Sequence, residues 1–388
     1  MKKTIKAIAA LSLAAAMVMS LAACGGSNGI QVGGSSTSST TAAAAAETKA
    51  ADAAAPAAEA AAPAEFETGN SSLKGQNVRV IIGSTSTSGD SYMMADIVTR
   101  YLSKEMGFNG KVDAIGNASA LDAVTTAKGD GKTLMMTHDI VYLSVLFGSV
   151  EDKYALENMT VGPRIGRNPG GCFGAAKESP YASLSEVTEY LKANPDATVS
   201  FNIEAGATSH IAFAAYYLHV KETEGEDVAK RIKAIVGGTT AEKLQRLWDR
   251  NADVIYGDTS AFKQYTEDGV EAQLAMNMFD SSSTVTGVEI QSMADDGIKF
   301  NGEAFDFPKD FAMYFPKDID ASVLAEYETA MKRVCENPEF QAEMEKLYYT
   351  YLSADEVGLQ ASNDFMYNKR EITSAIVAQA PSLDEITG

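Results

Sequence analysis

Cysteine and histidine are scarce in this chain of 388 residues, which contains three of each. The histidines His138, His210 and His219 lie far apart and show none of the Cys/His spacings that suit a metal ion. Cys172 and Cys335 are able to pair in an oxidising compartment, but no spacing rule requires it, and we expect two buried free thiols. The sequence therefore predicts no metal centre and no cofactor.

Long apolar runs are also missing beyond the N-terminus, so nothing there reaches the roughly 20 apolar residues of a membrane-spanning helix. Lysines at positions 2, 3 and 6 precede a short apolar run over residues 7–21, which ends in Leu-Ala-Ala-Cys at residues 21–24. This pattern is typical of a secretory signal, and its end resembles the lipobox of bacterial lipoproteins. We expect residues 1–24 to be a lipoprotein signal, with Cys24 lipidated and anchoring an extracytoplasmic protein to the cell membrane. The alternative is an ordinary secreted protein.

Bulky apolar residues are rare from residue 25 to residue 71, where Ala, Ser, Gly, Thr and Pro dominate. Such a segment cannot form a core, and we predict a disordered tether there. The remaining residues, 72–388, are numerous enough for two lobes of ordinary domain size.

Basic residues are few relative to acidic ones: 32 Lys and Arg face 52 Asp and Glu, which gives a formal net charge of -20. Removal of the three signal lysines brings it to -23 (-20 minus 3). This sign disfavours nucleic acid and anionic membrane surfaces as partners. A small anionic ligand is still compatible with it, because salt screens charges beyond about 8 Å and local N–H donors then decide binding.

The chain does contain a distinctive stretch from Asn77 to Met106, NVRVII-GSTSTSGDS-YMMADIVTRYLSKEM. A β-branched apolar run predicts a buried strand, and apolar residues at helical spacing after residue 91 predict a helix. The loop between them is rich in hydroxyl groups and ends where the helix begins, so its backbone N–H groups and the helix dipole favour an anion. The candidate ligand-binding residues of this loop are Ser84, Thr85, Ser86, Thr87, Ser88 and Gly89.

The same design recurs about a hundred residues later. Thr198–Ile203 (TVSFNI) predicts a strand, the loop EAGATSH follows, and the apolar sequence IAFAAYYLHV predicts a helix. Two such junctions suggest two lobes that face one another across a ligand. The candidates in the second loop are Gly206, Ala207, Thr208, Ser209 and His210.

The order of the other segments predicts an α/β fold, because strands and helices alternate and so favour largely parallel sheets with helices on both faces. Residues 162–180 look like a crossing into the second lobe, and the strand predicted at Phe311–Phe315 returns to the first. We therefore predict one lobe from residues 72–171 and 305–388, and another from residues 172–304. Closure of the two lobes on a ligand is the expected motion.

Four other side chains have two readings each. His138 follows a strand at the edge where ligands of open α/β sheets collect, and it either contacts a ligand or caps its loop. Asp258, at another strand end, either accepts an ammonium group of an amino acid ligand or caps the helix that follows. Arg164 and Arg167 either balance a carboxylate or lie on the surface.

No catalytic constellation is evident. Ser209 and His210 are neighbours in the first turn of a predicted helix and so point in different directions, and the G-x-S-x-G elbow of hydrolases is absent. We therefore expect a binding protein rather than an enzyme.

Several segments, taken in order, resemble the substrate-binding receptors of tripartite tricarboxylate transporters, the TctC or Bug-like family of extracytoplasmic solute receptors. The strongest are KANPD followed by G-x-T-S-H. The full set comprises YLSKEMG (101–107), DGKTL (130–134), SLSEVTEYLKANPDATVSF (183–201), GATSH (206–210), ADVIYGD (252–258) and ENPEF (336–340).

The resemblance implies a Venus-flytrap fold that resembles periplasmic binding proteins, and a small carboxylate held by amides and hydroxyls of one loop from each lobe. It also implies delivery of that ligand to a membrane permease, by a receptor that we expect to be a monomer. The first loop departs from the family pattern of two adjacent glycines with an Asp three residues after the first, since Ser88-Gly89 and Tyr92 stand there and Asp90 is shifted. The alternatives are a binder of another oxyanion or of an amino acid for a different transporter, and a surface lipoprotein without a transport role.

Overall fold

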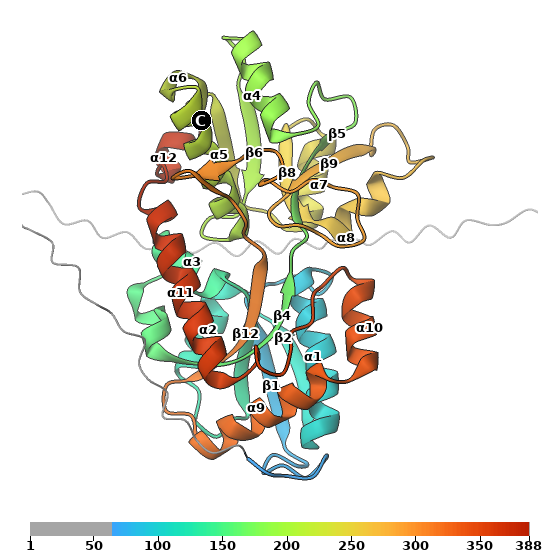
Figure 1. Ribbon diagram of the computed structural model, residues 1–388, viewed down its shortest axis with the longest axis vertical. Helices are drawn as coiled ribbons and strands as arrows, with labels where there is room; N and C mark the ends of the chain where they lie inside the picture. Colours follow the sequence, from blue (N-terminus) through green and yellow to red (C-terminus); the bar gives the residue numbers. More distant parts are fainter. Residues whose placement is uncertain (1–63, 388) are drawn as a thin grey trace, which may run out of the picture. The chain divides into compact units, whose positions relative to one another are not determined.

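The structure is a computed structural model that describes residues 64–387. Its framework is a pair of five-stranded sheets, ordered β2-β1-β3-β12-β4 and β7-β6-β8-β5-β9, with helices packed on both faces (Figure 1). The strands of the first sheet are β1 (Asn77–Ile82), β2 (Asn109–Ala114), β3 (Thr133–Thr137), β4 (Met159–Asn168) and β12 (Lys309–Pro316). Those of the second are β5 (Gly171–Ala176), β6 (Val199–Ile203), β7 (Ile232–Val236), β8 (Val254–Asp258) and β9 (Met276–Ser281), and a separate hairpin comprises β10 (Lys299–Phe300) and β11 (Glu303–Ala304).

Most helices follow a strand, as the alternating pattern predicts. They are α1 (Asp90–Met106), α2 (Asn117–Thr125), α3 (Ile140–Leu146), α4 (Leu184–Ala193), α5 (Thr208–Thr223), α6 (Glu226–Ala229), α7 (Thr240–Trp248), α8 (Thr259–Phe262), α9 (Ala321–Cys335), α10 (Pro338–Lys346), α11 (Leu359–Val377) and α12 (Leu383–Ile386). Short 3-10 helices are η1 (Asp152–Tyr154), η2 (Leu156–Asn158) and η3 (Lys263–Tyr265).

The prediction of an α/β fold with largely parallel strands is confirmed, with one reversed strand in each sheet. Strands β1, β2 and β3 are parallel, whereas β12 pairs antiparallel with both β3 and β4. In the second sheet β6, β7 and β8 are parallel, and β5 is antiparallel to β8 and β9. Each reversed strand is the first strand of its sheet that the chain forms after crossing from the other sheet, so both sheets are mixed.

Alternation along the strands divides the apolar side chains between cores on opposite faces of a sheet. On β12, Phe311, Met313 and Phe315 join α1 and α9 in one core, while Ala312 and Tyr314 face another. This period of two is what a strand buried on both faces requires. Every residue of β12 is buried, as expected for an interior strand that lies between β3 and β4.

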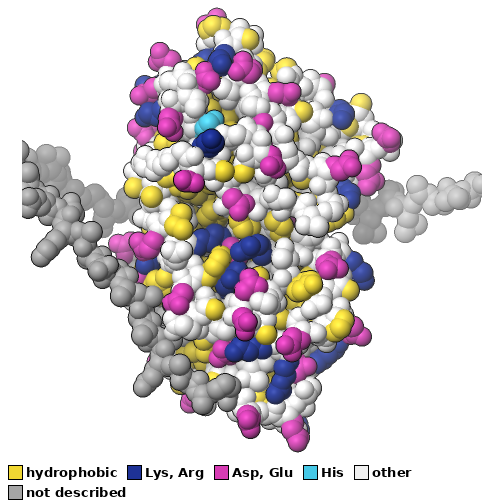
Figure 2. Space-filling model, viewed as in Figure 1, with side chains coloured by type: hydrophobic (Ala, Val, Ile, Leu, Met, Phe, Trp, Pro, Cys, Tyr) yellow, Lys and Arg dark blue, Asp and Glu magenta, His cyan; other side chains and the backbone are white. Residues whose placement is uncertain are grey.

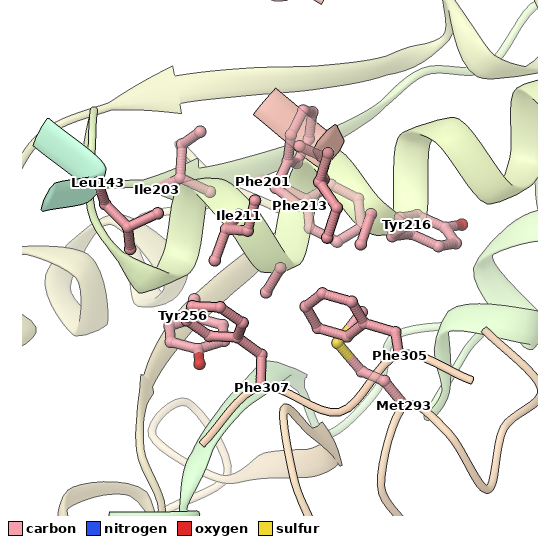
Figure 3. Packing of buried hydrophobic residues seen from close by; sticks show 14 of the residues in the cluster. Leu143, Phe201, Ile203, Ile211, Phe213, Tyr216, Tyr256, Met293, Phe305 and Phe307 are labelled. Carbon is pink, nitrogen blue, oxygen red and sulfur yellow. The ribbon is translucent and has the colours of Figure 1, made fainter. Parts of the chain in front are cut away.

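The largest core extends through the second sheet and α5. Figure 3 shows Phe201 of β6 and Phe213 of α5 packed in one group with Phe305 and Phe307, which precede β12. The rings of Phe305 and Phe307 stack with centroids 6.1 Å apart. The segment that returns to the first sheet is therefore held by apolar packing on the second.

Helix ends follow the local signals of the sequence. Ser183 caps α4 by accepting the N–H of Glu186, as the SLSE pattern predicts. Thr239 and Glu242 form a complete capping box at α7. Gly107 ends α1 in the left-handed conformation, with φ of 80°, and a Cβ there would lie 2.4 Å from the Gly69 carbonyl oxygen.

The structure confirms some of the remaining predictions and does not test the others. Cys172 and Cys335 are both free and buried, as expected. Across residues 64–387 no helix has the length and apolar character needed to cross a bilayer. The signal, Cys24 and most of the tether lie outside the described residues. The division into lobes stays a prediction, and α12 packs on β7 of the second sheet through a bridge between Ala234 and Thr387, although the predicted division assigns it to the first lobe.

Candidate ligand-binding site

The first hydroxyl-rich loop connects β1 to α1 and is organised by its own serines. The Ser86 N–H donates to the Ser84 hydroxyl at 3.1 Å, and the Ser88 N–H donates to the Ser86 hydroxyl at 3.2 Å. These bonds replace the regular backbone ladder and fix the loop at the start of α1. At the start of this 17-residue helix the Ser91 N–H donates to the Asp90 carboxylate at 2.8 Å and the Tyr92 N–H donates to the Gly89 carbonyl at 3.1 Å. The Asp90 N–H has no partner among the described residues, and it is the donor that this helix start leaves for a ligand.

The second loop connects β6 to α5 and is also held by side chains. Ser209 accepts the Glu204 N–H at 2.8 Å, and His210 Nδ1 accepts the Gly206 N–H at 3.2 Å. The His210 ring stacks on Phe147 with centroids 3.8 Å apart, and burial lowers its pKa to about 4, so the ring is neutral at physiological pH. His210 therefore builds the loop, and no Ser–His dyad forms.

Both loops open onto one cavity of about 390 Å³. It is lined by residues that follow β1, β3, β6 and β8, so it lies at the carboxyl ends of strands from both sheets, where ligands of α/β sheets collect. Of the predicted site residues, those that line it are Ser84, Thr85, Ser86, Ser88, Gly89, His138, Thr208, Ser209 and Asp258.

Four predicted site residues do not line the cavity: Thr87, Gly206, Ala207 and His210. Gly206 has φ of +68°, and a Cβ there would lie 2.5 Å from the Ser149 hydroxyl, so the loop packs against the segment after α3 at this point. Whether the nine lining residues contact a ligand stays a prediction.

The start of a third helix, α7, lies at the same cavity, and the sequence analysis did not predict it. Gly238, Thr239 and Thr240, at the beginning of α7, are lining residues. The signal for them was present, since Gly-Gly-Thr-Thr follows a strand just as the other two loops do, and Thr239 with Glu242 has capping-box spacing.

Charged side chains of the cavity were also missed. Lys309, the first residue of β12, forms an ion pair with Asp90, the first residue of α1; Lys309 is buried and the Asp90 side chain is 14% exposed. Burial disfavours both charges, but the neighbouring opposite charges outweigh it, so the pKa of Asp90 is lowered and that of Lys309 is raised. Among the described residues, the Lys309 ammonium has no other hydrogen-bond partner, which leaves donors for a ligand.

A second ammonium group, that of Lys243, also lines the cavity. Lys243 of α7 is buried, donates to the Tyr256 carbonyl at 3.1 Å, and forms an ion pair of 2.7 Å with Glu204. His138 accepts the Ile140 N–H at 3.3 Å, as a loop cap does; it also lines the cavity, but its contact with a ligand stays a prediction. Burial, followed by the charge of Lys309, lowers the pKa of His138 to about 4.

For Asp258 the structure confirms the capping role, while acceptance of a ligand's ammonium group stays a prediction. It caps α8 by accepting the Ser260 N–H at 2.9 Å and the Ser260 hydroxyl at 2.5 Å, and it also lines the cavity. The Asn168 amide donates to Asp258 and, at 3.1 Å, to Asp90, so it joins α1 to β8. Burial, and then the charge of Asp90, raise the pKa of Asp258.

Arg164 and Arg167 balance a carboxylate of the protein itself, Asp310, and neither lines the candidate cavity. Each donates to Asp310 of β12 at 2.9 Å, and Lys369 of α11 joins Asp310 at 2.7 Å. Lys369 also reaches Asp139, which precedes α3, at 2.8 Å. Burial opposes the charge of Asp310, but these three cations outweigh it and lower its pKa. In Figure 2, Lys and Arg side chains gather at the middle of the face that carries α11.

The cavity offers several kinds of hydrogen-bond donor to a ligand. Its donors are backbone N–H groups at helix starts, hydroxyl groups and ammonium groups, which together suit a small anion. Within residues 64–387, no cluster of three or more His, Cys, Asp or Glu is arranged to hold a metal ion.

Two α/β lobes with a polar cavity between strand ends define a ligand receptor of the periplasmic-binding-protein class. The family described as "Tripartite tricarboxylate transporter family receptor" matches residues 94–378, and the chain belongs to this family. The resemblance found in the sequence is thereby confirmed. The family is one of transporter receptors and not of enzymes.

Solved structures agree on the fold. The periplasmic binding protein BugD is 16% identical with a TM-score of 0.62, and the match covers 79% of this chain and 98% of that one. MatC of Rhodopseudomonas palustris with bound malate is 13% identical with a TM-score of 0.62, over 78% and 99% of the chains. Rpa4515 of R. palustris with adipate is 14% identical with a TM-score of 0.59, over 78% and 97%. A comparison with curated proteins gives no match.

Proposed function

We propose that the protein is a lipid-anchored, extracytoplasmic solute-binding protein that captures a small carboxylate and delivers it to a tripartite tricarboxylate-type permease. The observation that carries the proposal is the meeting of two hydroxyl-rich helix starts, those of α1 and α5, at one cavity that also contains the Lys309 ammonium. Two proteins of similar fold have malate and adipate bound. Charge-assisted hydrogen bonds contribute about 1.5–3 kcal/mol each, so a few of them suffice for micromolar affinity.

Closure around the ligand belongs to this proposal. The two sheets are joined by β4 leading into β5 and by the segment leading into β12, and bending at these connections would bring the α1 and α5 loops together on a ligand. The receptor would act as a monomer, with the permease recognising the closed, liganded form.

A thermal-shift and calorimetric screen tests the proposal directly. Stabilisation by malate, adipate, citrate or related acids supports it. Stabilisation by phosphate or sulfate alone favours a receptor for another oxyanion, and no response to any small anion favours a surface lipoprotein without a transport role.

The first loop offers a matched pair of variants. Thr85 and Thr87 are both exposed and make no side-chain hydrogen bond in the described structure, but only Thr85 lines the cavity. We expect Thr85→Glu to weaken carboxylate binding by roughly 10-fold or more, because it places a negative charge beside the ligand. Thr87→Glu should bind as the wild type does. Calorimetric titration of both variants checks this, and equal affinities would remove the first loop from the site.

The anchor has its own test. If Cys24 is lipidated, Cys24→Ala should move the protein from the membrane fraction to the soluble fraction without changing ligand affinity. Immunoblotting of fractionated cells measures this, with Cys172→Ala as the control because Cys172 is buried in the second sheet. Membrane association of Cys24→Ala equal to that of the wild type would contradict the anchor.

A further inference from the structure

The charges around the cavity do not match a ligand that is only negative. Two ammonium groups line it, and four carboxylates do so as well. Each ammonium is already paired with one carboxylate, Lys309 with Asp90 and Lys243 with Glu204. The carboxylates without a lysine partner are those of Glu242 and Asp258.

These two carboxylates differ in their surroundings. Glu242 is exposed and accepts the Thr239 N–H at 2.6 Å as part of the capping box, so water and a helix start satisfy it. Asp258 is only 8% exposed, and its hydrogen bonds come from the neutral groups of Asn168 and Ser260. Lys309 stands near enough to interact with it electrostatically, but that ammonium makes its hydrogen bond to Asp90.

Asp258 also retains capacity to accept a further bond. A carboxylate offers about four acceptor positions. In Asp258 one oxygen accepts two donors from Ser260, and the other accepts the single Asn168 amide. A buried carboxylate without a cationic partner is unfavourable, and a cation delivered by the ligand removes that deficit.

We propose that the natural ligand carries an ammonium group beside its carboxylate, and that Asp258 accepts this ammonium, which makes the ligand class amino acids. This inference rests on the proposed function, because the helix starts of α1 and α5 would still hold the carboxylate end. A dicarboxylate of the same length brings a second negative charge to a cavity that has two more carboxylates than ammonium groups. Asp258 is therefore the residue that determines specificity.

Matched pairs of ligands distinguish an amino acid receptor from a receptor for acids that have no ammonium group. Calorimetric titration of the full chain would compare alanine with propionate, aspartate with succinate and glutamate with glutarate, where each second compound lacks only the ammonium group. We expect at least one amino acid to bind about 10- to 100-fold more tightly than its partner, the range of one charge-assisted hydrogen bond. Equal or tighter binding of the acids without ammonium would overturn the inference and leave the proposed function standing.

The variant Asp258→Asn tests the residue itself. It keeps an acceptor for the Ser260 N–H, so α8 remains capped, but it removes the negative charge. We expect it to abolish the preference for the amino acid while binding of the acid without ammonium stays unchanged. The control is Asp253→Asn, immediately before the other end of the same strand and outside the cavity, where the wild-type preference should persist.

Two further outcomes would contradict the role of Asp258 or the proposed function. A preference that survives in Asp258→Asn overturns the role of Asp258. Failure of the folded wild type to bind any of the six compounds, confirmed by an unchanged thermal transition, counts against the inference and the proposed function together.

Discussion

Replacing Asp310 with Asn is expected to lower the free energy of unfolding by about 3–5 kcal/mol, the cost of breaking a buried ion pair from one side. The Asp310 side chain is fully buried and is in contact with Arg164, Arg167 and Lys369 at 2.7–2.9 Å. Arg164 is itself only 3% exposed, so water cannot replace the lost carboxylate. After the change, Asp139 is the only carboxylate left in contact with Lys369 among the described residues.

Urea unfolding followed by circular dichroism measures this cost. Asp306→Asn is the control, because Asp306 lies four positions earlier, is exposed, and makes no ion pair among the described residues; its effect should stay within about 0.5 kcal/mol. A loss below about 1 kcal/mol for Asp310→Asn would show that the three cations are balanced by other groups.

Acid should reduce the difference in unfolding free energy between the wild type and Asp310→Asn. The pKa of Asp310 is lowered in the folded protein, so its charge stabilises the fold above the ordinary value of 3.8, and this contribution is lost as the pH falls below it. In the Asn variant nothing titrates at this position. The difference in unfolding free energy should therefore be constant at neutral pH and shrink in strong acid.

Local patterns account for the parts of the site that the sequence predicted. The strand β1, its serine loop and α1 follow one another within 30 residues, so periodicity and capping chemistry identify them without knowledge of the fold. The same holds for β6 and α5. Because strand ends of both sheets meet at the cavity, two local motifs were enough to locate it.

The roles of individual side chains in those motifs were harder to predict from the sequence, because they depend on partners elsewhere in the chain. The sequence suggested that His210 contacts a ligand. In the structure its ring stacks on Phe147, and its Nδ1 accepts the Gly206 N–H. Ser209 looked free for a ligand, yet it accepts the Glu204 N–H, so an acidic replacement there would disturb the loop as well as the cavity. Neither partnership has a sequence signature.

Charge pairs were the least predictable part. Asp90 and Lys309 are 219 positions apart, and Asp310 is 146 positions from Arg164. Lys309 adjoins the predicted strand at Phe311–Phe315, but the strand begins two residues earlier than expected and thereby carries Lys309 and Asp310 into the buried region. Which two charges meet depends on the register of β12 beside β3 and β4, which the sequence alone does not define.

Lys309→Met should cost about 3 kcal/mol of stability, since it leaves Asp90 and Asp258 close together around one Asn168 amide with no cation between them. The Lys309 and Asp90 side chains are 9% and 14% exposed, so solvent screening is weak. The position of Asp90 in the first turn of α1 offsets part of the loss, because the helix start favours a negative charge. Lys317→Met, beyond the opposite end of β12 and exposed, is the matched control and should change little.

The double variant Lys309→Met/Asp90→Asn decides whether the loss comes from the ion pair. Removing both charges leaves Asp258 as the only carboxylate of the pair without a cation, so the double variant should be more stable than Lys309→Met alone, and the two single effects should fail to add by about 1–3 kcal/mol. Urea unfolding of all four proteins at neutral pH gives the coupling free energy. Simple additivity would mean that Lys309 stabilises the fold through packing of its aliphatic chain, and the ammonium would then be held for the ligand and not for Asp90.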